Sequence, residues 1–204
     1  MSLPHPLPFF TPEEYLSLER LSELRHEYLD GSVYAMAGES VAHSTICFNL
    51  AVAAGSRLRG TPCRGFSPNM KVRAGEGGLY AYPDLTIVCG EPAFADARAD
   101  VLTNPTVIFE VLSPSTEAYD RGEKFSRYRA QVESLRDYVL IAQDKPRAER
   151  HTRRDDGSWE AGVAEGLGGV LELPSAGCRL PLAEIYERVE FGAARPADTA
   201  PKEL

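Results

Sequence analysis

The chain has 204 residues, of which 43% are hydrophobic and 25% are charged, and its formal net charge is −8. These values are typical of a folded, water-soluble domain, and no apolar run reaches the roughly 18 residues that a membrane-spanning helix needs. The negative charge argues against broad, sequence-independent binding of nucleic acid, although a local basic patch or a bound cation can offset it.

The length predicts one domain over residues 1–190, and the small, polar, proline-bearing residues 191–204 predict a frayed tail. The first ten residues lack the basic and apolar regions of a secretory signal. Four cysteines occur without a C-x-x-C pair: Cys47, Cys63, Cys89 and Cys178. They predict buried thiols in a reducing compartment, and hence a cytoplasmic protein without membrane contact.

Capping and turn residues predict the first elements. Thr11, Pro12 and Glu14 form a helix start with a capping box, and the helix is expected to fade near residues 24–25. Asp30-Gly31 then predicts the turn of a β-hairpin over residues 26–36.

A longer helix is predicted over residues 40–58 because apolar residues recur there at helical spacing. One stripe comprises Val41, Thr45, Phe48 and Val52, and it is widened by Ile46, Leu50 and Ala53. His43 also lies in this helix. It is either a packed or surface residue or a contact to a phosphate group.

Two short strands are predicted at residues 61–66 and 69–74. Lys71 and Arg73 share one face of the second strand because strand side chains alternate. They are either a solvated pair or contacts to a phosphate near the acidic strand that follows. Residues 90–104 are expected to form a loop, mainly a connection.

Two apolar strands at residues 82–88 and 105–112 each carry one carboxylate, Asp84 and Glu110. A carboxylate within an apolar strand requires a partner because its desolvation is costly. If the strands are antiparallel neighbours, the start of one lies beside the end of the other and the two side chains converge. Two oxygen ligands without a Cys/His cluster predict Mg²⁺ or Mn²⁺ rather than Zn²⁺.

A helix is predicted over residues 116–131, where Asp120, Lys124 and Tyr128 share one face at spacings of four. Asp120 and Lys124 are either a surface ion pair or, because this helix starts where the Glu110 strand ends, a means to bring Lys124 to the metal site.

The remaining chain predicts a strand at residues 136–142, a hairpin whose first arm, 145–154, is basic, and a short helix near residues 180–187. The basic arm is either a solvated strand face or a patch that binds a nucleic-acid backbone.

The ordered motifs resemble a known family. They are Glu27-Tyr28-Leu29-Asp30-Gly31, His43, Lys71-Val72-Arg73, Tyr82-Pro83-Asp84-Leu85, Glu110-Val111-Leu112-Ser113-Pro114-Ser115-Thr116, and Asp120-Arg121-Gly122-Glu123-Lys124 with Tyr128. Together they resemble the Uma2 (DUF820) family of the PD-(D/E)XK nuclease superfamily. This resemblance implies a restriction-endonuclease-like α/β fold with α+β character, in which helices flank a central mixed sheet with extra β-hairpins. Leu112 stands where the superfamily motif has lysine, and the resemblance implies that Lys124 replaces it.

The resemblance also implies a Mg²⁺-dependent endonuclease, with Mn²⁺ as a substitute, that hydrolyses DNA by a metal-activated water and acts as a homodimer. The implied catalytic residues are Asp84, Glu110 and Lys124. The implied metal ligands are Asp84, Glu110, the Val111 backbone carbonyl and Glu27, unless Glu27 is an exposed strand carboxylate. The implied substrate contacts are Lys71, Arg73, His43 and Tyr128. The alternative is a non-catalytic scaffold that keeps the nuclease fold and binds nucleic acid or protein.

Overall fold

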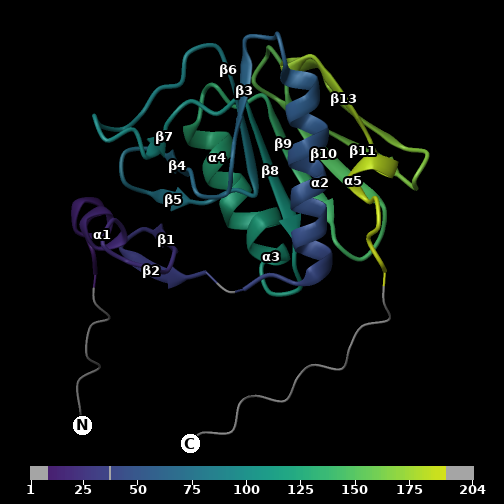
Figure 1. Cartoon of the computed structure of the whole chain (residues 1–204). Helices are drawn as coiled ribbons and strands as arrows, with labels where there is room; N and C mark the ends of the chain where they lie inside the picture. The colour runs from purple at the N-terminus through teal and green to yellow at the C-terminus, as the bar shows by residue number, and fades with distance from the viewer. Residues whose placement is uncertain (1–8, 37, 192–204) are drawn as a thin grey trace, which may run out of the picture.

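The computed structural model describes residues 9–36 and 38–191, so the predicted tail at 191–204 lies outside the described residues except for residue 191. Its strands form two large sheets and a small one (Figure 1). The five-stranded sheet has the order β2 (Ser32–Ala35), β1 (His26–Leu29), β5 (Leu79–Ala81), β4 (Lys71–Ala74) and β7 (Val101–Leu102). The six-stranded sheet has the order β11 (Trp159–Glu165), β10 (Arg147–Arg153), β9 (Asp137–Ala142), β8 (Val107–Leu112), β6 (Leu85–Cys89) and β3 (Cys63–Phe66).

The third sheet pairs β12 (Val170–Leu173) with β13 (Cys178–Pro181). The helices are α1 (Pro12–Glu19), α2 (Val41–Leu58), α3 (Glu117–Tyr119), α4 (Phe125–Gln131) and α5 (Leu182–Ile185). A π-helical turn, Asp120–Lys124, joins α3 to α4, and a 3₁₀ turn, Pro174–Ala176, precedes β13. Both large sheets are mixed, since β8 pairs with β9 and β4 with β7 in parallel while the other pairs are antiparallel. The predicted mixed α/β architecture is confirmed.

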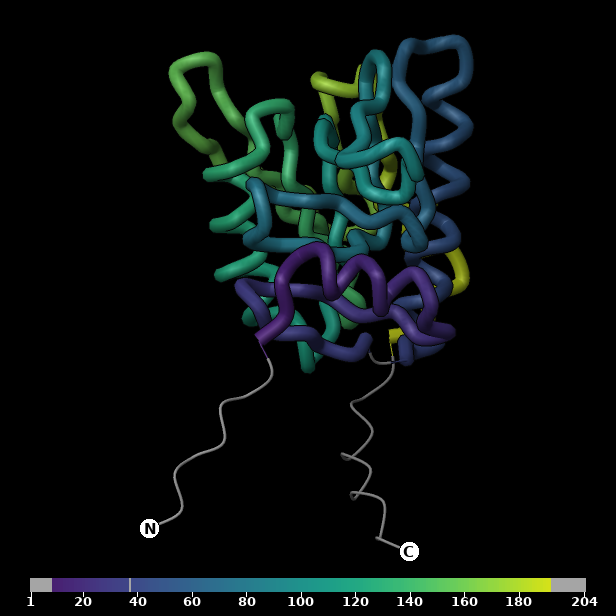
Figure 2. Tube along the Cα trace, turned by 90° about the vertical axis from the view of Figure 1, so that its left-hand side faces the viewer, coloured from purple at the N-terminus to yellow at the C-terminus, as the bar shows by residue number. Residues whose placement is uncertain are grey.

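The six-stranded sheet lies between two apolar layers. Along β8, Val107, Phe109 and Val111 pack in the cluster that includes the buried face of α2. The alternate residues Ile108 and Leu112 pack in a second cluster with α4 and the five-stranded sheet. This alternation follows from the period of two in a strand. In the side view, α1 lies against the β1–β2 hairpin at one end of the molecule (Figure 2).

The predicted capping box and hairpin turn are both present. Thr11 N donates to Glu14 Oε2 at 2.8 Å, and Glu14 N donates to Thr11 Oγ1 at 3.2 Å. At the hairpin, Asp30 and Gly31 have φ angles of 45° and 93°. Two consecutive positive φ values are the geometry of a tight hairpin turn, and they explain why Asp-Gly was a reliable signal.

The apolar stripe that α2 buries is not the main stripe predicted from the sequence. Val41, Phe48 and Val52 are 86%, 70% and 56% exposed, so this part of the interpretation is wrong. The buried residues are Ile46, Leu50, Ala53, Ala54 and Leu58. Apolar residues occupy both sides of this helix, and periodicity cannot tell which side the sheet covers.

Three further expectations need correction. The predicted loop 90–104 contains β7, which pairs in parallel with β4. The predicted helix 116–131 is interrupted by the π-helical turn, and such turns are frequent at functional sites. Cys63 and Cys89 stand opposite each other on β3 and β6 and form a disulfide, so only Cys47 and Cys178 are free thiols. The 26-residue separation gave no sequence signal for this pairing.

None of the described helices is long and apolar enough to cross a lipid bilayer.

Candidate metal centre and active site

Strand register brings the two predicted carboxylates together. β6 runs antiparallel to β8 with Leu85 opposite Phe109, so the next position places Asp84 opposite Glu110. Asp84 lies directly before β6, and its Oδ2 accepts a hydrogen bond of 2.7 Å from Val111 N. The start of one strand therefore lies beside the end of the other, as the sequence predicted.

Lys124 reaches this place from the π-helical turn. Its Nζ lies 3.0 Å from Glu110 Oε1, 3.2 Å from Glu27 Oε1 and 3.4 Å from Asp120 Oδ1. Lys124, Asp120 and Glu110 are 4%, 3% and 3% exposed. The alternative of a surface ion pair between Asp120 and Lys124 is therefore wrong. The Tyr138 hydroxyl donates to the Asp120 carbonyl at 2.9 Å, which satisfies a backbone acceptor of the irregular turn.

Glu27 belongs to the same group of charges. Its side chain is only 14% exposed, and its Oε1 also accepts a hydrogen bond of 3.2 Å from Tyr82 N. The interpretation of Glu27 as an exposed strand carboxylate does not fit this geometry. Asp120 joins the site although sequence reasoning did not assign it there. Its spacing of four from Lys124 was the available signal.

The donor set fits a hard cation. Three carboxylates, those of Glu27, Glu110 and Asp120, contact a single buried ammonium group, and a fourth, that of Asp84, stands opposite Glu110 on the neighbouring strand. Glu110 Oε1 lies 3.0 Å from Lys124 Nζ, but the two groups are not oriented for a hydrogen bond. Among the described residues, this buried oxygen has no hydrogen-bond donor. An excess of negative charge and an unsatisfied buried carboxylate oxygen are what a divalent cation with oxygen ligands would neutralise.

Burial raises the pKa of Glu110 well above its usual range, and the neighbouring carboxylates raise it further while Lys124 opposes them. Burial alone would lower the pKa of Lys124, but Glu110, Glu27 and Asp120 raise it well above its usual value. Lys124 is therefore a permanent cation here. It is suited to stabilise negative charge and not to accept a proton.

His43 approaches the site from α2. Its Nε2 lies 3.6 Å from Asp84 Oδ2, and its Nδ1 lies 3.0 Å from Glu39 Oε2. Burial alone would lower the pKa of His43, but Asp84 and then Glu39 raise it to about 9. The structure thus brings His43 next to a predicted metal ligand.

The other predicted substrate contacts lie at different depths. Tyr128 is fully buried one turn after Lys124, and its hydroxyl has no hydrogen-bond partner among the described residues. Lys71 is 6% exposed, with its Nζ 3.3 Å from Asp100 Oδ2 and 5.4 Å from the centre of the Tyr82 ring. The structure therefore pairs Lys71 with Asp100 rather than with the four carboxylates. Arg73 shares its strand face and is half-buried.

The predicted basic arm is largely paired within the molecule. Arg147 contacts Glu149 and Glu165, and the guanidinium of Arg153 donates to the carbonyls of Val132, Glu133 and Arg129. These contacts favour a structural explanation of the basic residues of β10.

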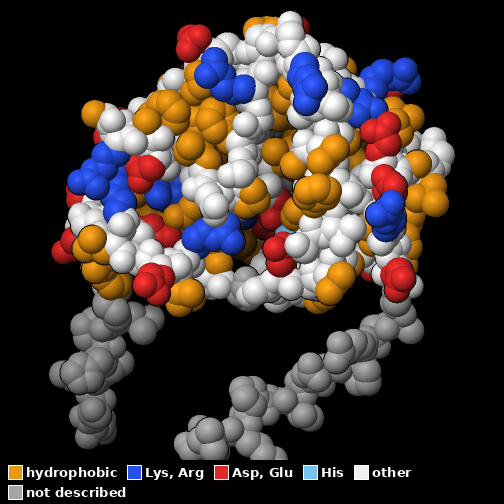
Figure 3. Space-filling model, in the orientation of Figure 1, with side chains coloured by type: hydrophobic (Ala, Val, Ile, Leu, Met, Phe, Trp, Pro, Cys, Tyr) orange, Lys and Arg blue, Asp and Glu red, His pale blue; other side chains and the backbone are white. Residues whose placement is uncertain are grey.

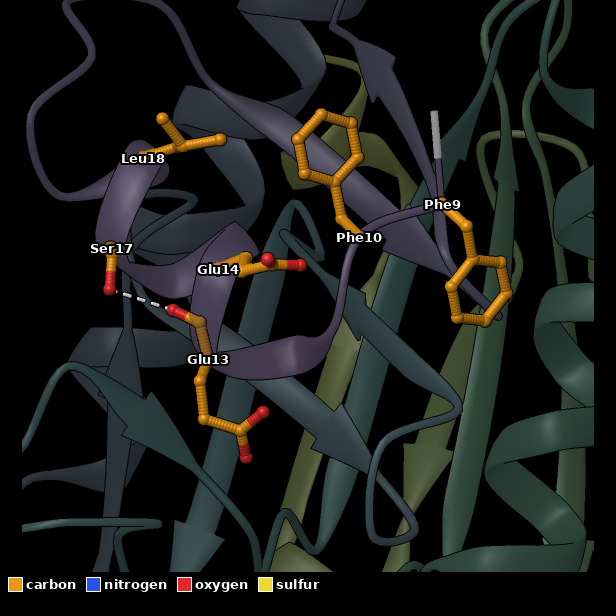
Figure 4. A pocket seen from close by; sticks show the side chains of 6 residues that line it. All are labelled: Phe9, Phe10, Glu13, Glu14, Ser17 and Leu18. Atoms are coloured by element: carbon orange, nitrogen blue, oxygen red, sulfur yellow. Dashed lines mark hydrogen bonds between the residues drawn. The ribbon is translucent and has the colours of Figure 1, made fainter. Parts of the chain in front are cut away.

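The surface around the carboxylates is hollowed. Acidic side chains and a histidine side chain gather in a hollow beside α2 (Figure 3). A separate depression of about 480 Å³ lies beside α1, where Ser17 Oγ donates to the Glu13 carbonyl within the helix (Figure 4). It is lined by Phe9, Phe10, Glu13, Glu14, Ser17 and Leu18. We place the candidate site at the carboxylates around Lys124 because burial there raises the pKa of both Glu110 and Asp120.

The sequence model of the Uma2 family, described as "Putative restriction endonuclease", matches residues 12–183. The chain belongs to the Uma2 family. An uncharacterized protein of Synechocystis sp. is 36% identical to this Uma2 chain over 186 residues, which cover 91% of this chain and 96% of the relative. A second uncharacterized protein of that organism is 32% identical over 149 residues, covering 73% and 84%.

A solved structure has the same fold. It is described as a putative nuclease belonging to DUF820 from Anabaena variabilis, and it superimposes on this Uma2 chain with a TM-score of 0.70 at 18% identity. The match covers 87% of this chain and 97% of that chain. The family and the fold class predicted from the motifs are confirmed.

Proposed function

We propose that this Uma2 protein is a Mg²⁺-dependent endonuclease that hydrolyses the phosphodiester bonds of DNA. The observation that carries the proposal is the convergence of Asp84 and Glu110 beside the buried ammonium group of Lys124. Membership of a family described as "Putative restriction endonuclease" supports the substrate class. Mn²⁺ is expected to replace Mg²⁺ because both prefer oxygen ligands.

Asp84 and Glu110 would hold the ion, with the Val111 carbonyl and Glu27 as further oxygen ligands. A divalent cation bound there supplies polarisation of the phosphate and an activated water. Lys124 remains positively charged and stabilises the negative charge that develops on the phosphoryl oxygens. Lys124 would take the role of the usual motif lysine, which is absent here because position 112 is leucine.

Four residues are proposed to contact the DNA or shape its site. His43 faces Asp84 and carries the positive charge that suits a phosphate. Lys71 and Arg73 share one face of β4, with Lys71 buried and Arg73 half-buried. The buried Tyr128 follows Lys124 by one helical turn, and its hydroxyl has no hydrogen-bond partner among the described residues. Lys71 must leave Asp100 before it can bind a phosphate.

The experiment is a nicking assay on supercoiled, relaxed and single-stranded DNA with Mg²⁺ or Mn²⁺. Asp84→Asn and Glu110→Gln keep the side-chain shape and should abolish nicking, whereas the matched control Glu165→Gln on β11 should not. Equal nicking by all four proteins would show that the activity comes from elsewhere. Calorimetric titration with Mn²⁺ separates the scaffold alternative, because a scaffold without the metal site would show no saturable binding that depends on Asp84.

We also propose that the protein is a homodimer joined through the outward face of α2. The exposed positions of this helix are all uncharged: Val41, Ser44, Phe48, Ala51, Val52, Gly55 and Ser56. A solvent-facing helix side normally carries charges. A two-fold interface needs a patch that fits itself, and Phe48 with the small Ser44 and Ala51 beside it provides a projection and a recess on one face. Hydrophobic side chains on this side of α2 are visible in Figure 3.

A further inference from the structure

Three potential metal donors of a different chemical kind lie next to the carboxylate site. Glu39 precedes α2, and His43 and Cys47 follow at spacings of four on the same side of the helix. One ligand atom from each lies within 4.8 Å of the others. A thiol, an imidazole and a carboxylate form a donor set that Zn²⁺ prefers and Mg²⁺ does not.

The distances suit a tetrahedral ion. With metal–nitrogen and metal–sulfur distances of about 2.1 and 2.3 Å, tetrahedral ligands are about 3.6 Å apart. His43 Nδ1 and Cys47 Sγ are 3.5 Å apart. His43 Nδ1 and Glu39 Oε2 are 3.0 Å apart, and two such ligands need about 3.4 Å. The Glu39 side chain is 54% exposed, so it can move by a few tenths of an ångström without repacking.

The second nitrogen of His43 supplies an independent observation. While Nδ1 faces Glu39 and Cys47, Nε2 faces Asp84 Oδ2 at 3.6 Å. Histidine ligands of metals commonly donate their other N–H to a carboxylate, which fixes the tautomer and the ring orientation. The Asp84 carboxylate is itself held by Val111 N, so the ring faces a carboxylate of fixed position.

We propose that Glu39, His43 and Cys47 form a binding site for Zn²⁺ or a similar thiophilic divalent cation, with water in the fourth position. The site is separate from the proposed Mg²⁺ site and linked to it through the His43–Asp84 contact. It uses the neutral imidazole, so binding of the ion and contact of a protonated His43 with phosphate exclude each other. It does not rest on the proposed nuclease activity, since the binding can be measured without DNA.

The test is a titration of the full-length protein with Co²⁺, which takes the same donors as Zn²⁺ and reports them by absorption. Excess reductant is left out so that the Cys63–Cys89 disulfide stays formed. We expect one equivalent of Co²⁺ to give the charge-transfer band of a thiolate ligand and the visible bands of a tetrahedral ion. Added Zn²⁺ should remove both.

Cys47→Ser should abolish the charge-transfer band, and His43→Gln should weaken binding at least tenfold. Cys178→Ser is the matched control, because it removes the other free thiol and should leave the spectrum unchanged. Asp84→Asn should weaken Zn²⁺ binding by about tenfold, as expected when the carboxylate partner of a histidine ligand is lost. Circular dichroism identifies any variant that fails to fold.

Wild-type protein without a thiolate band, or a band that survives in folded Cys47→Ser, would overturn the proposal. Nicking that fails while the Co²⁺ band appears would leave this site standing and reject the nuclease assignment alone. Zn²⁺ binding that persists with full affinity in folded His43→Gln would also count against it.

Discussion

The Lys124 ammonium lies 3.0 Å from the Glu110 carboxylate, although β8 has leucine two residues after Glu110, where a neighbouring lysine would have been expected. The lysine reaches the site from the π-helical turn that follows the strand. The ammonium group beside Glu110 thus comes from a helical turn and not from the strand that carries Glu110.

Lys124→Met should both destabilise the protein and stop nicking. Removal of the ammonium leaves Glu110, Asp120 and Glu27 without their shared cation, and breaking a buried ion pair costs about 3–5 kcal/mol. Urea unfolding measures the first effect, and the plasmid assay the second. Lys145→Met, at an exposed lysine, is the control and should change neither. A loss of less than about 1 kcal/mol would show that the ion pairs do not have the proposed role.

Leu112→Lys should partly restore nicking to Lys124→Met. Leu112 packs in the cluster on the α4 side of β8, the side that Glu110 also faces, so a lysine at this position points toward the same carboxylates. Leu112→Met in the same background keeps the length without the charge. Rescue by both substitutions would attribute the effect to packing, and rescue by neither would refute the equivalence of the two positions.

Asp100→Asn should lower stability at neutral pH but not in acid. Asp100 Oδ1 is 2.7 Å from Arg20 Nη2, and Oδ2 is 3.3 Å from Lys71 Nζ. The hydrogen bond from Arg20 lowers the pKa of Asp100 to about 2. Partial desolvation opposes this shift, and the nearby Lys71 adds to it. Because the folded pKa lies below the unfolded value near 4, the stabilisation is complete above about pH 4 and disappears as the pH falls through about 2.

The expected loss for Asp100→Asn is about 1 kcal/mol at pH 7, reduced from the full value because the pair is partly exposed. Denaturant unfolding at a series of pH values measures it. Asp155→Asn, at an exposed turn, provides the comparison. A difference from wild type that is as large at pH 2 as at pH 7 would contradict the ionic explanation.

Phe48→Lys should convert a dimer to a monomer without lowering the stability of the fold, because Phe48 is 70% exposed on α2. Light scattering after size-exclusion chromatography measures the mass. Leu167→Lys adds the same charge at another exposed apolar residue, 54% exposed, and should leave the dimer intact. A wild-type monomer at micromolar concentration, or dimers of both variants, would reject the α2 interface.

Much of the candidate site could be predicted from the sequence because it depends on the periodicity and order of neighbouring elements. Asp84 and Glu110 could be placed together from strand period and antiparallel order, and the spacing of Asp120, Lys124 and Tyr128 indicated their shared face. Lys71 and the disulfide could not be placed in this way. Lys71 meets Asp100 because β4 pairs with β7, and Cys63 meets Cys89 because β3 pairs with β6. No local sequence pattern specifies the register of these two strand pairs.

Taken alone, the sequence determined the order of elements, the two acidic strands and the family, because periodicity, turns and ordered motifs are properties of the chain itself. Only the tertiary structure decided which side of α2 is buried, how deeply Lys124 lies among carboxylates, and that His43 faces Asp84 with one nitrogen and Cys47 with the other. These features depend on burial and on contacts between distant segments, and both are set when the sheets and helices pack against each other.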